Sequence, residues 1–285
     1  MSAFGDIWQH LPAQMNPVLF SIGSFRLQYY GLMYIVAFGV TYGMVRWRIG
    51  REERFDVSKN QTQDLTTAMI LGLIIGARLG YVLFYNAAYY LRHPLEIVLP
   101  FTVSADGISF TGITGMSYHG GLIGVIAASY IYIRRQKLNF RQMADLYVPV
   151  IPLGYTFGRL GNFINGELYG RITEAPIGMV FPQAGDGRLR HPSQLYEAFF
   201  EGVFLFILLW GLRKIDRPSG VMLSFYLIGY GSVRFVIEFF RQPDAHLGFI
   251  IGPFSMGQIL CFGMVASGIL LYACLRRLMV AESSR

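Results

Sequence analysis

Long apolar runs alternate with short polar segments along almost the whole chain. A run of about 20 apolar residues is long enough to cross the hydrocarbon core of a bilayer as a helix. Seven such spans are expected, at residues 28–45, 65–85, 119–133, 143–160, 194–212, 220–240 and 254–275. Residues 86–117 and 162–192 hold too many polar, proline and glycine residues to cross, and are expected to form loops. The pattern predicts an all-α integral membrane protein with seven transmembrane helices in a single polytopic domain, residues 1–285.

Composition agrees with this class of protein. The chain is 53% hydrophobic and only 14% charged, whereas a soluble domain averages about 25% charged residues. The net charge of +7 is compatible with nucleic-acid binding, but in a polytopic membrane protein it is more typical of basic loops that face anionic lipid headgroups. We therefore expect membrane lipids, and no nucleic acid, as partners.

The basic residues predict how the chain is oriented. Of the 24 lysines and arginines, 15 fall on the side that holds the C-terminus, 6 fall on the other side, and 3 lie inside predicted spans. Because cytoplasmic loops carry the excess of Lys and Arg, the C-terminus is expected in the cytoplasm and the N-terminus outside it.

The three arginines inside spans are the first candidates for chemistry: Arg78, Arg159 and Arg234, all in the outer half of the membrane. An arginine near the centre of a span costs at least ~2.5–3.5 kcal/mol, so such residues usually face a cavity or a partner. A planar guanidinium that cannot be deprotonated suits the recognition of phosphate. The alternative is a structural role, by snorkelling or by pairing with Glu167, Glu197, Glu201 or Glu238.

A second candidate is Ser117–Gly121, which opens the third predicted span on the outer side. A helix N-terminus followed by glycines offers free backbone N–H groups to an anion. His119 lies there, and because imidazole titrates near neutrality it is a candidate for proton transfer. The alternative is a histidine that only satisfies local hydrogen bonds.

The glycine-rich stretch 158–170, GRLGNFINGELYG, begins at the membrane boundary with Arg159. Its glycines and asparagines suit a tight polar turn rather than a continuing helix. The polar side chains expected on that turn are Asn162, Asn165 and Glu167. The alternative is a capped helix end, with Gly161 or Gly166 in the left-handed conformation.

Two further segments add polar groups to the outer layer. Ser193 is expected to cap the fifth span with Glu197 in its first turn. Tyr230, Arg234 and Glu238 follow one another at intervals of four and share a helix face, where Glu238 orients or neutralises Arg234. Tyr30, at the outer end of the first span, is also compatible with the interfacial aromatic belt.

The cysteines exclude some chemistry. Cys261 and Cys274, both in the last apolar run, form no metal-ligand spacing and have no polar neighbours that would make them nucleophiles. Any thiol chemistry therefore needs a thiol from a partner, and neither a metal nor a cofactor is expected.

These stretches together resemble the bacterial phosphatidylglycerol–prolipoprotein diacylglyceryl transferase family. The resemblance extends from Tyr29 to Leu260, and a string as long as GRLGNFINGE is highly specific. The matching stretches are YYGLMY, GARLGYVLFYN, GMSYHGGLIG, GRLGNFINGELYGR, HPSQLYE, GYGSVRFVIEFFRQPD and SMGQIL. The loop 171–190 is short and variable, and no contact is assigned to it.

The resemblance implies a seven-span enzyme of the bacterial inner membrane, with its N-terminus and both large loops in the periplasm. It implies transfer of the diacylglyceryl group of phosphatidylglycerol to the lipobox cysteine of a prolipoprotein signal peptide, which forms a thioether and releases glycerol phosphate. His119, Arg159 and Arg234 would be the catalytic residues, with His119 activating the thiol and the arginines holding the phosphate. The candidate substrate-binding residues are Arg159, Arg234, Tyr30, Arg78, Asn162, Glu167, Gly170, Tyr230 and Glu238. The alternative function is an anion or lipid transporter, or flippase, that uses the same intramembrane arginines.

Overall fold

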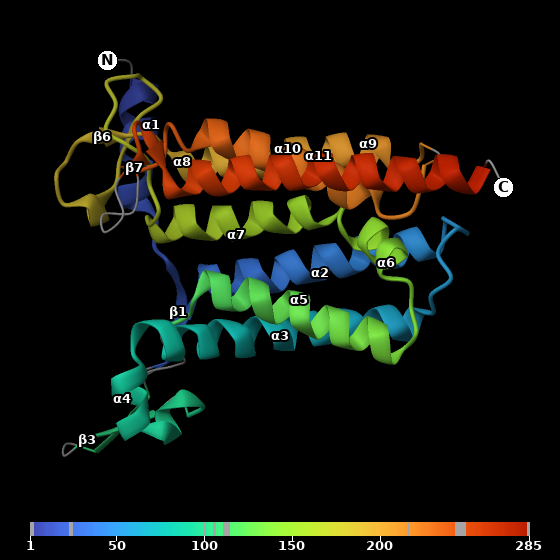
Figure 1. Ribbon diagram of the computed structural model, residues 1–285. Coiled ribbons are helices and arrows are strands. Elements are labelled where there is room, and N and C mark those ends of the chain that lie inside the picture. The colour runs from blue at the N-terminus through green and yellow to red at the C-terminus, as the bar shows by residue number, and fades with distance from the viewer. Residues whose placement is uncertain are drawn as a thin grey trace. The chain divides into compact units, whose positions relative to one another are not determined.

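The computed structural model describes residues 3–22, 25–99, 101–104, 107–110, 115–215, 217–242 and 249–283, which are mostly helical (Figure 1). The helices are α1 (Ala3–Gln14), α2 (Tyr29–Ile49), α3 (Lys59–Tyr85), α4 (Ala87–Arg92), α5 (Tyr118–Arg135), α6 (Phe140–Tyr147), α7 (Ile151–Asn165), α8 (Ser193–Tyr196), α9 (Leu205–Leu212), α10 (Val221–Ile237) and α11 (Met256–Ser283). Short 3-10 turns form η1 (Pro94–Ile97) and η2 (Pro182–Ala184), and the π-helical η3 (Glu197–Phe204) joins α8 to α9.

Four small sheets, each of two strands, are formed by the described residues. The strands are β1 (Val18–Ile22), β2 (Phe25–Gln28), β3 (Phe101–Ser104), β4 (Gly107–Phe110), β5 (Met179–Val180), β6 (Leu189–Arg190), β7 (Phe249–Ile251) and β8 (Phe254–Ser255). Each sheet is formed by two strands that follow one another in the chain. In the sheet of β3 and β4, Phe101 lies opposite Phe110 and Ser104 opposite Gly107. The predicted loops 86–117 and 162–192 thus contain secondary structure of their own.

The helices confirm a membrane protein of helical type. Three helical runs among the described residues are long and apolar enough to cross a bilayer: Lys59–Tyr85, Ser193–Leu212 and Met256–Leu278. The apolar helix α10 is shorter, and a helix or pair of helices lies at each of the other predicted spans. The number of crossings and the orientation remain predictions.

The fourth predicted span, 143–160, is wrong in its boundaries. Two helices occupy this region, α6 and α7, with a turn over Val148–Val150 between them. Pro152 lies in the first turn of α7, where its missing N–H is tolerated, and its ring would clash with the carbonyl of residue 148 in a continuous helix. Helix α7 then continues to Asn165, past the predicted end at Leu160.

The chain divides into two compact units, which are described separately. The larger unit comprises residues 1–21, 26–48 and 141–285, and the smaller unit comprises residues 22–25 and 49–140. In the larger unit α10 packs along α11, and α7 packs along η3. The strands β6 and β7 gather with α1 at one end of the α10–α11 pair, whereas the C-terminus lies at the other end (Figure 1).

Two clusters of buried side chains hold the larger unit together. Val148, Leu205, Leu209 and Met222 form a core between the turn that precedes α7 and helices α9 and α10. At the end that carries the strands, Phe163, Met179 and Phe181 form a second core, on which Trp8 and Leu11 of α1 pack. The Trp8 indole Nε1 donates to the carbonyl of Ile177 at 3.1 Å, which ties α1 to the segment before β5.

In the smaller unit, α3 and α5 pack through glycines. Gly72, Gly76 and Gly80 recur every four residues along α3 and face Gly120 and Gly124 of α5. The backbones are so close that a Cβ atom at position 80 would lie 2.7 Å from the Cα of Gly120. Small residues at this spacing are typical of membrane helix pairs, because they let the two backbones approach each other closely.

Candidate active site

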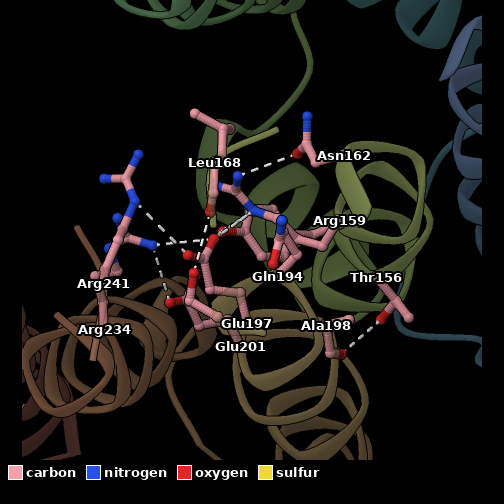
Figure 2. A network of polar contacts seen from close by, with 12 residues as sticks. Thr156, Arg159, Asn162, Leu168, Gln194, Glu197, Ala198, Glu201, Arg234 and Arg241 are labelled. Atoms are coloured by element: carbon pink, nitrogen blue, oxygen red, sulfur yellow. Dashed lines mark hydrogen bonds and ion pairs between the residues drawn. The ribbon is translucent and has the colours of Figure 1, made fainter. Parts of the chain in front are cut away.

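Two buried carboxylates form the centre of a polar network in the larger unit. Glu197 and Glu201 both lie in η3, and both are completely buried. The segment is π-helical throughout, and π-helical turns occur frequently at functional sites. Burial of two acids in a span requires cations beside them, and these come from α7 and from the end of α10 (Figure 2).

Arg159 of α7 approaches the carboxylates from one side. Its Nε lies 2.7 Å from Glu197 Oε2 and donates to the Tyr155 hydroxyl at 2.6 Å, while its NH1 group donates to Asn162 Oδ1 at 3.2 Å. No described residue accepts a hydrogen bond from the NH2 group. The guanidinium therefore keeps free N–H donors on its NH2 group.

Arg234 of α10 lies on the opposite side of Glu197 and is engaged more fully (Figure 2). Its NH1 group is 3.2 Å from Glu197 Oε2 and 3.3 Å from Glu201 Oε1, and its NH2 group is 3.1 Å from Glu238 Oε2. Three carboxylates thus surround one guanidinium. The predicted pairing of Arg234 with Glu238 is confirmed.

Arg241, just beyond α10, adds a third cation. Its Nε is 3.8 Å from Glu197 Oε1 and its NH1 group is 3.9 Å from Glu238 Oε2, both longer than hydrogen bonds. The buried Nε has no hydrogen-bond partner among the described residues. Arg241 is therefore held by charge, and more loosely than Arg159 or Arg234.

The N-terminus of α11 holds Glu238. The Ser255 hydroxyl donates to Glu238 Oε1 at 3.0 Å, and it also accepts from the backbone N–H of Gln258. The Gln258 side chain accepts from the N–H of Ser255 at 3.0 Å, so the two residues form a reciprocal capping box. A Cβ atom at Gly257 would lie 2.8 Å from the same carboxylate oxygen. The positive end of α11 therefore faces the Glu238 carboxylate.

The stretch after Arg159 differs from the predicted polar turn. Asn162 is buried within α7, and Asn165 is its last residue. Gly166 caps the helix with a φ of 69°, so the alternative of a capped helix end is confirmed, with Gly166 as the left-handed glycine. The Asn162 amide donates to Glu167 Oε1 at 2.7 Å. The helix continues because the segment packs inside the protein, where its backbone groups need intrahelical partners.

The segment that leads into α8 also differs from its prediction. Pro192 is the cap residue, and Ser193 is the first residue of the helix, so the expected role of Ser193 as N-cap is wrong. Its hydroxyl instead donates to the carbonyl of Leu168 at 3.1 Å, and the Gln194 amide donates to the carbonyl of Glu167 at 2.6 Å. These bonds attach the segment that follows α7 to the start of α8.

Three other predicted site residues lie in the larger unit. The Tyr30 hydroxyl is 3.0 Å from that of Tyr34, and its ring is close enough that a Cβ atom at Gly161 would lie 3.2 Å from it. The Tyr230 ring meets that of Tyr155 edge-on, at 6.1 Å between centroids. The Gly170 N–H donates to the carbonyl of His191 at 2.8 Å, and a Cβ there would lie 2.7 Å from that oxygen, so the position admits only glycine.

Arg78 and His119 belong to the smaller unit. The Arg78 guanidinium is buried and donates to the carbonyls of Ile97, at 2.9 Å, and of Glu96 and Gly115. It therefore attaches the segment that follows α4, and the one that precedes α5, to α3. His119 is exposed in the first turn of α5, beside Tyr118. The predicted helix start is confirmed, with Ser117 accepting from the N–H of Gly120 at 3.2 Å.

Two ionisable groups in the segment between α7 and α8 have shifted pKa values. Burial lowers the pKa of His191, whose Nδ1 is 3.1 Å from the Tyr196 hydroxyl. Arg190, whose NH2 group is 2.6 Å from Asp186, lowers the pKa of that carboxyl group.

Sequence reasoning missed Tyr155, Arg241 and Ser255. Tyr155 is four residues before Arg159 and therefore on the same helix face, which is a signal that could have found it. Arg241 is one of the six basic residues expected on the outer side of the membrane. Ser255 opens the stretch SMGQIL, which contributes to the family resemblance.

The fold and site define a helical membrane protein with a buried cluster of arginines and glutamates. A family model described as prolipoprotein diacylglyceryl transferase matches residues 17–274. The phosphatidylglycerol–prolipoprotein diacylglyceryl transferase of Chlorobaculum tepidum is 53% identical over 269 residues, which cover 94% of this chain and 93% of that protein. The protein of the same name from Geobacter sulfurreducens is 46% identical over 90% of this chain and 93% of its own.

The chain belongs to the prolipoprotein diacylglyceryl transferase family. It is therefore a membrane-bound transferase, as the resemblance implied. The comparisons give no support to the alternative of an anion or lipid transporter.

Proposed function

We propose that this enzyme transfers the diacylglyceryl group of phosphatidylglycerol to the lipobox cysteine of a prolipoprotein signal peptide, at the periplasmic side of the bacterial inner membrane. The chain crosses that membrane seven times with its N-terminus in the periplasm. The distribution of basic residues and the helix at each apolar run support this topology.

The observation that carries the proposal is the free edge of the Arg159 guanidinium. In the membrane, a guanidinium whose N–H donors are not all used can donate them to an anionic ligand. A phosphate accepts two parallel N–H···O bonds from one guanidinium. Arg159 therefore binds the phosphodiester directly. Arg234, which three carboxylates already surround, supplies positive charge behind it.

The reaction is a displacement at carbon. The cysteine sulfur forms a bond to the glycerol carbon that carries the phosphate ester, and the C–O bond to that phosphate breaks. The electron pair leaves with the oxygen, so the leaving glycerol phosphate gains one negative charge. Fixed guanidinium groups stabilise that developing charge without reorganising during the step.

His119 accepts the thiol proton. A free cysteine has a pKa of about 8.5 and is mostly protonated at neutral pH, so a base that removes the proton accelerates attack. Support for this role comes from its exposure at the start of a helix held by Ser117 and by the Ser117 N–H···O=C bond to Ala77, 2.9 Å long. Asn162, Glu167, Gly170, Tyr30 and Tyr230 shape the lipid site, and Glu238 positions Arg234. Arg78 is a further candidate for contact with the lipid.

The direct test is transfer to a lipobox peptide. Purified protein incubated with phosphatidylglycerol and the peptide should raise the peptide mass by one diacylglyceryl unit, while a peptide with serine in place of the cysteine should stay unmodified. Arg159→Ala should abolish transfer, whereas Arg92→Ala, at an exposed arginine at the end of α4, should leave it unchanged. Full activity of Arg159→Ala would refute the phosphate site.

A second variant tests the base. General-base catalysis contributes about 10²–10⁴-fold, so His119→Asn should lose at least a hundredfold in rate at neutral pH. The loss should shrink as the pH approaches the thiol pKa, because the thiolate then forms unaided. Wild-type transfer by His119→Asn at pH 7 would exclude the role.

A further inference from the structure

The buried cluster is balanced in charge by its own side chains. Its three cations are Arg159, Arg234 and Arg241, and its three anions are Glu197, Glu201 and Glu238. Each carboxylate is at most 3% exposed. A phosphodiester that enters this set adds one negative charge at a site of low dielectric, where an uncompensated charge is costly unless a carboxylate is neutralised.

Two of the three carboxylates have several cationic or hydrogen-bonding partners. Glu197 is within ion-pair distance of Arg159, Arg234 and Arg241. Glu238 accepts from the Ser255 hydroxyl and faces the positive end of α11. Protonation of either would remove several favourable interactions at once.

Glu201 is compensated least. Among the described residues its one ion pair is to the NH1 group of Arg234 at 3.3 Å, and that group also lies 3.2 Å from Glu197. Two carboxylates that share one cation favour a state in which one of them carries a proton. Glu201 is therefore the carboxylate that gives up its charge most readily.

The Tyr155 hydroxyl suits both protonation states of Glu201. It donates to Glu201 Oε2 at 2.6 Å and lies 3.3 Å from Glu197 Oε2. Because a phenol both donates and accepts, it can accept a hydrogen bond from protonated Glu201 and turn its own proton to Glu197. Neither state leaves a buried hydroxyl unpaired.

We propose that Glu201 takes up one proton from solution when the phosphodiester of the lipid headgroup binds at Arg159, so that the occupied cluster stays neutral. This inference rests on the proposed function. The titratable and charged groups that surround Glu201 come from its own helix, from α7, from α10 and from α11: Glu197, Tyr155, Arg159, Arg234 and Cys261.

Calorimetry tests the uptake. Dioctanoyl phosphatidylglycerol is titrated into the full-length protein in detergent at pH 7.5, in two buffers of different ionisation enthalpy, and the difference in heat gives the number of protons taken up. The wild type should take up about one proton, and Glu201→Gln close to none. The control Glu174→Gln, which removes an exposed carboxylate, should match the wild type.

The pH dependence gives a second readout. A coupled proton makes the wild-type affinity fall about tenfold for each pH unit over which free Glu201 is ionised, whereas the affinity of Glu201→Gln should stay level. An equal slope in both proteins would overturn the proposal. Infrared difference spectroscopy needs no variant: lipid binding should produce the C=O stretching band of a protonated carboxyl group, and its absence from the wild type would overturn the proposal as well.

The outcomes separate this inference from the proposed function. A wild-type protein that neither binds phosphatidylglycerol nor modifies the lipobox peptide refutes the function. A protein that binds the lipid and modifies the peptide without taking up a proton refutes only the role of Glu201.

Discussion

Replacing Glu197 with glutamine should make the empty enzyme less stable and its complex with anionic lipid tighter. Glu197 is completely buried and contacts guanidinium groups from three directions, at 2.7, 3.2 and 3.8 Å. The substitution keeps the shape of the side chain but removes its charge. The cluster then carries one more positive than negative charge.

The magnitude follows from the class of interaction. Removing one partner of a buried ion pair costs about 3–5 kcal/mol, because the remaining charge is left uncompensated. The amide oxygen of glutamine still accepts a hydrogen bond from Arg159, so we expect the lower end, about 3 kcal/mol. At roughly 2–4 °C per kcal/mol, the midpoint of thermal unfolding should fall by about 6–12 °C.

The lipid should reverse much of this loss. The extra positive charge favours an anionic headgroup, and a gain of about 1.4 kcal/mol in binding corresponds to tenfold tighter affinity. A ligand stabilises the folded state by RT ln(1 + [L]/Kd), so at the same lipid concentration a lower Kd should raise the unfolding midpoint more in Glu197→Gln than in the wild type.

The assay is thermal unfolding in detergent, followed by tryptophan fluorescence, with phosphatidylglycerol or with zwitterionic phosphatidylethanolamine. Glu174→Gln, at an exposed carboxylate, serves as the matched control and should behave as the wild type. A lipid-induced shift in Glu197→Gln no larger than that in the wild type would refute the reasoning. It would mean that Glu197 does not compete with the phosphate for the arginines.

Three other substitutions test the surroundings of the site. Gly76→Val should separate α3 from α5 and prevent stable folding, judged by size-exclusion chromatography, whereas Gly43→Ala should be neutral because no atom lies within 4 Å of the added Cβ. Burial lowers the pKa of His191, so its contribution to stability is complete above about pH 6.5 and is lost as the pH falls through the folded-state pKa. His191→Phe should accordingly flatten the dependence of the unfolding midpoint between pH 7 and pH 5. Ser255→Ala should cost about 1 kcal/mol through loss of the α11 cap and should weaken lipid binding, since Glu238 loses a hydrogen bond.

The sequence predicted the helical elements well because apolar length alone determines where a helix can be buried in lipid. Three of the four expected acids, Glu197, Glu201 and Glu238, do pair with Arg159 or Arg234, since a charge in a span needs a counter-charge. The sequence did not reveal how they pair. Glu197 contacts Arg159 and Arg234 from a different helix, and only the packing of α7, η3 and α10 brings the three together.

Two differences from the expected arrangement have other physical causes. Arg78 and Arg159 both lie inside predicted spans, yet the Arg78 guanidinium binds backbone carbonyls of residues 96, 97 and 115. The spacing of side chains along the sequence does not predict which backbone carbonyls a later loop places beside Arg78. The fourth predicted span runs through Pro152 because the hydropathy of this stretch is high, although the proline itself signals a helix boundary.

The balance of charge in the cluster argues for a role in function rather than in stability. Well-packed apolar residues would hold α7, η3 and α10 together at least as well as three buried ion pairs, which contribute little net stability. A neutral set of charges, however, can be inserted into the membrane without a large electrostatic penalty and still be converted into an anion site. Loss of one negative charge is enough for that conversion. Arg159, with its free donors, and Glu201, with its single shared cation, are the two residues in the cluster arranged for it.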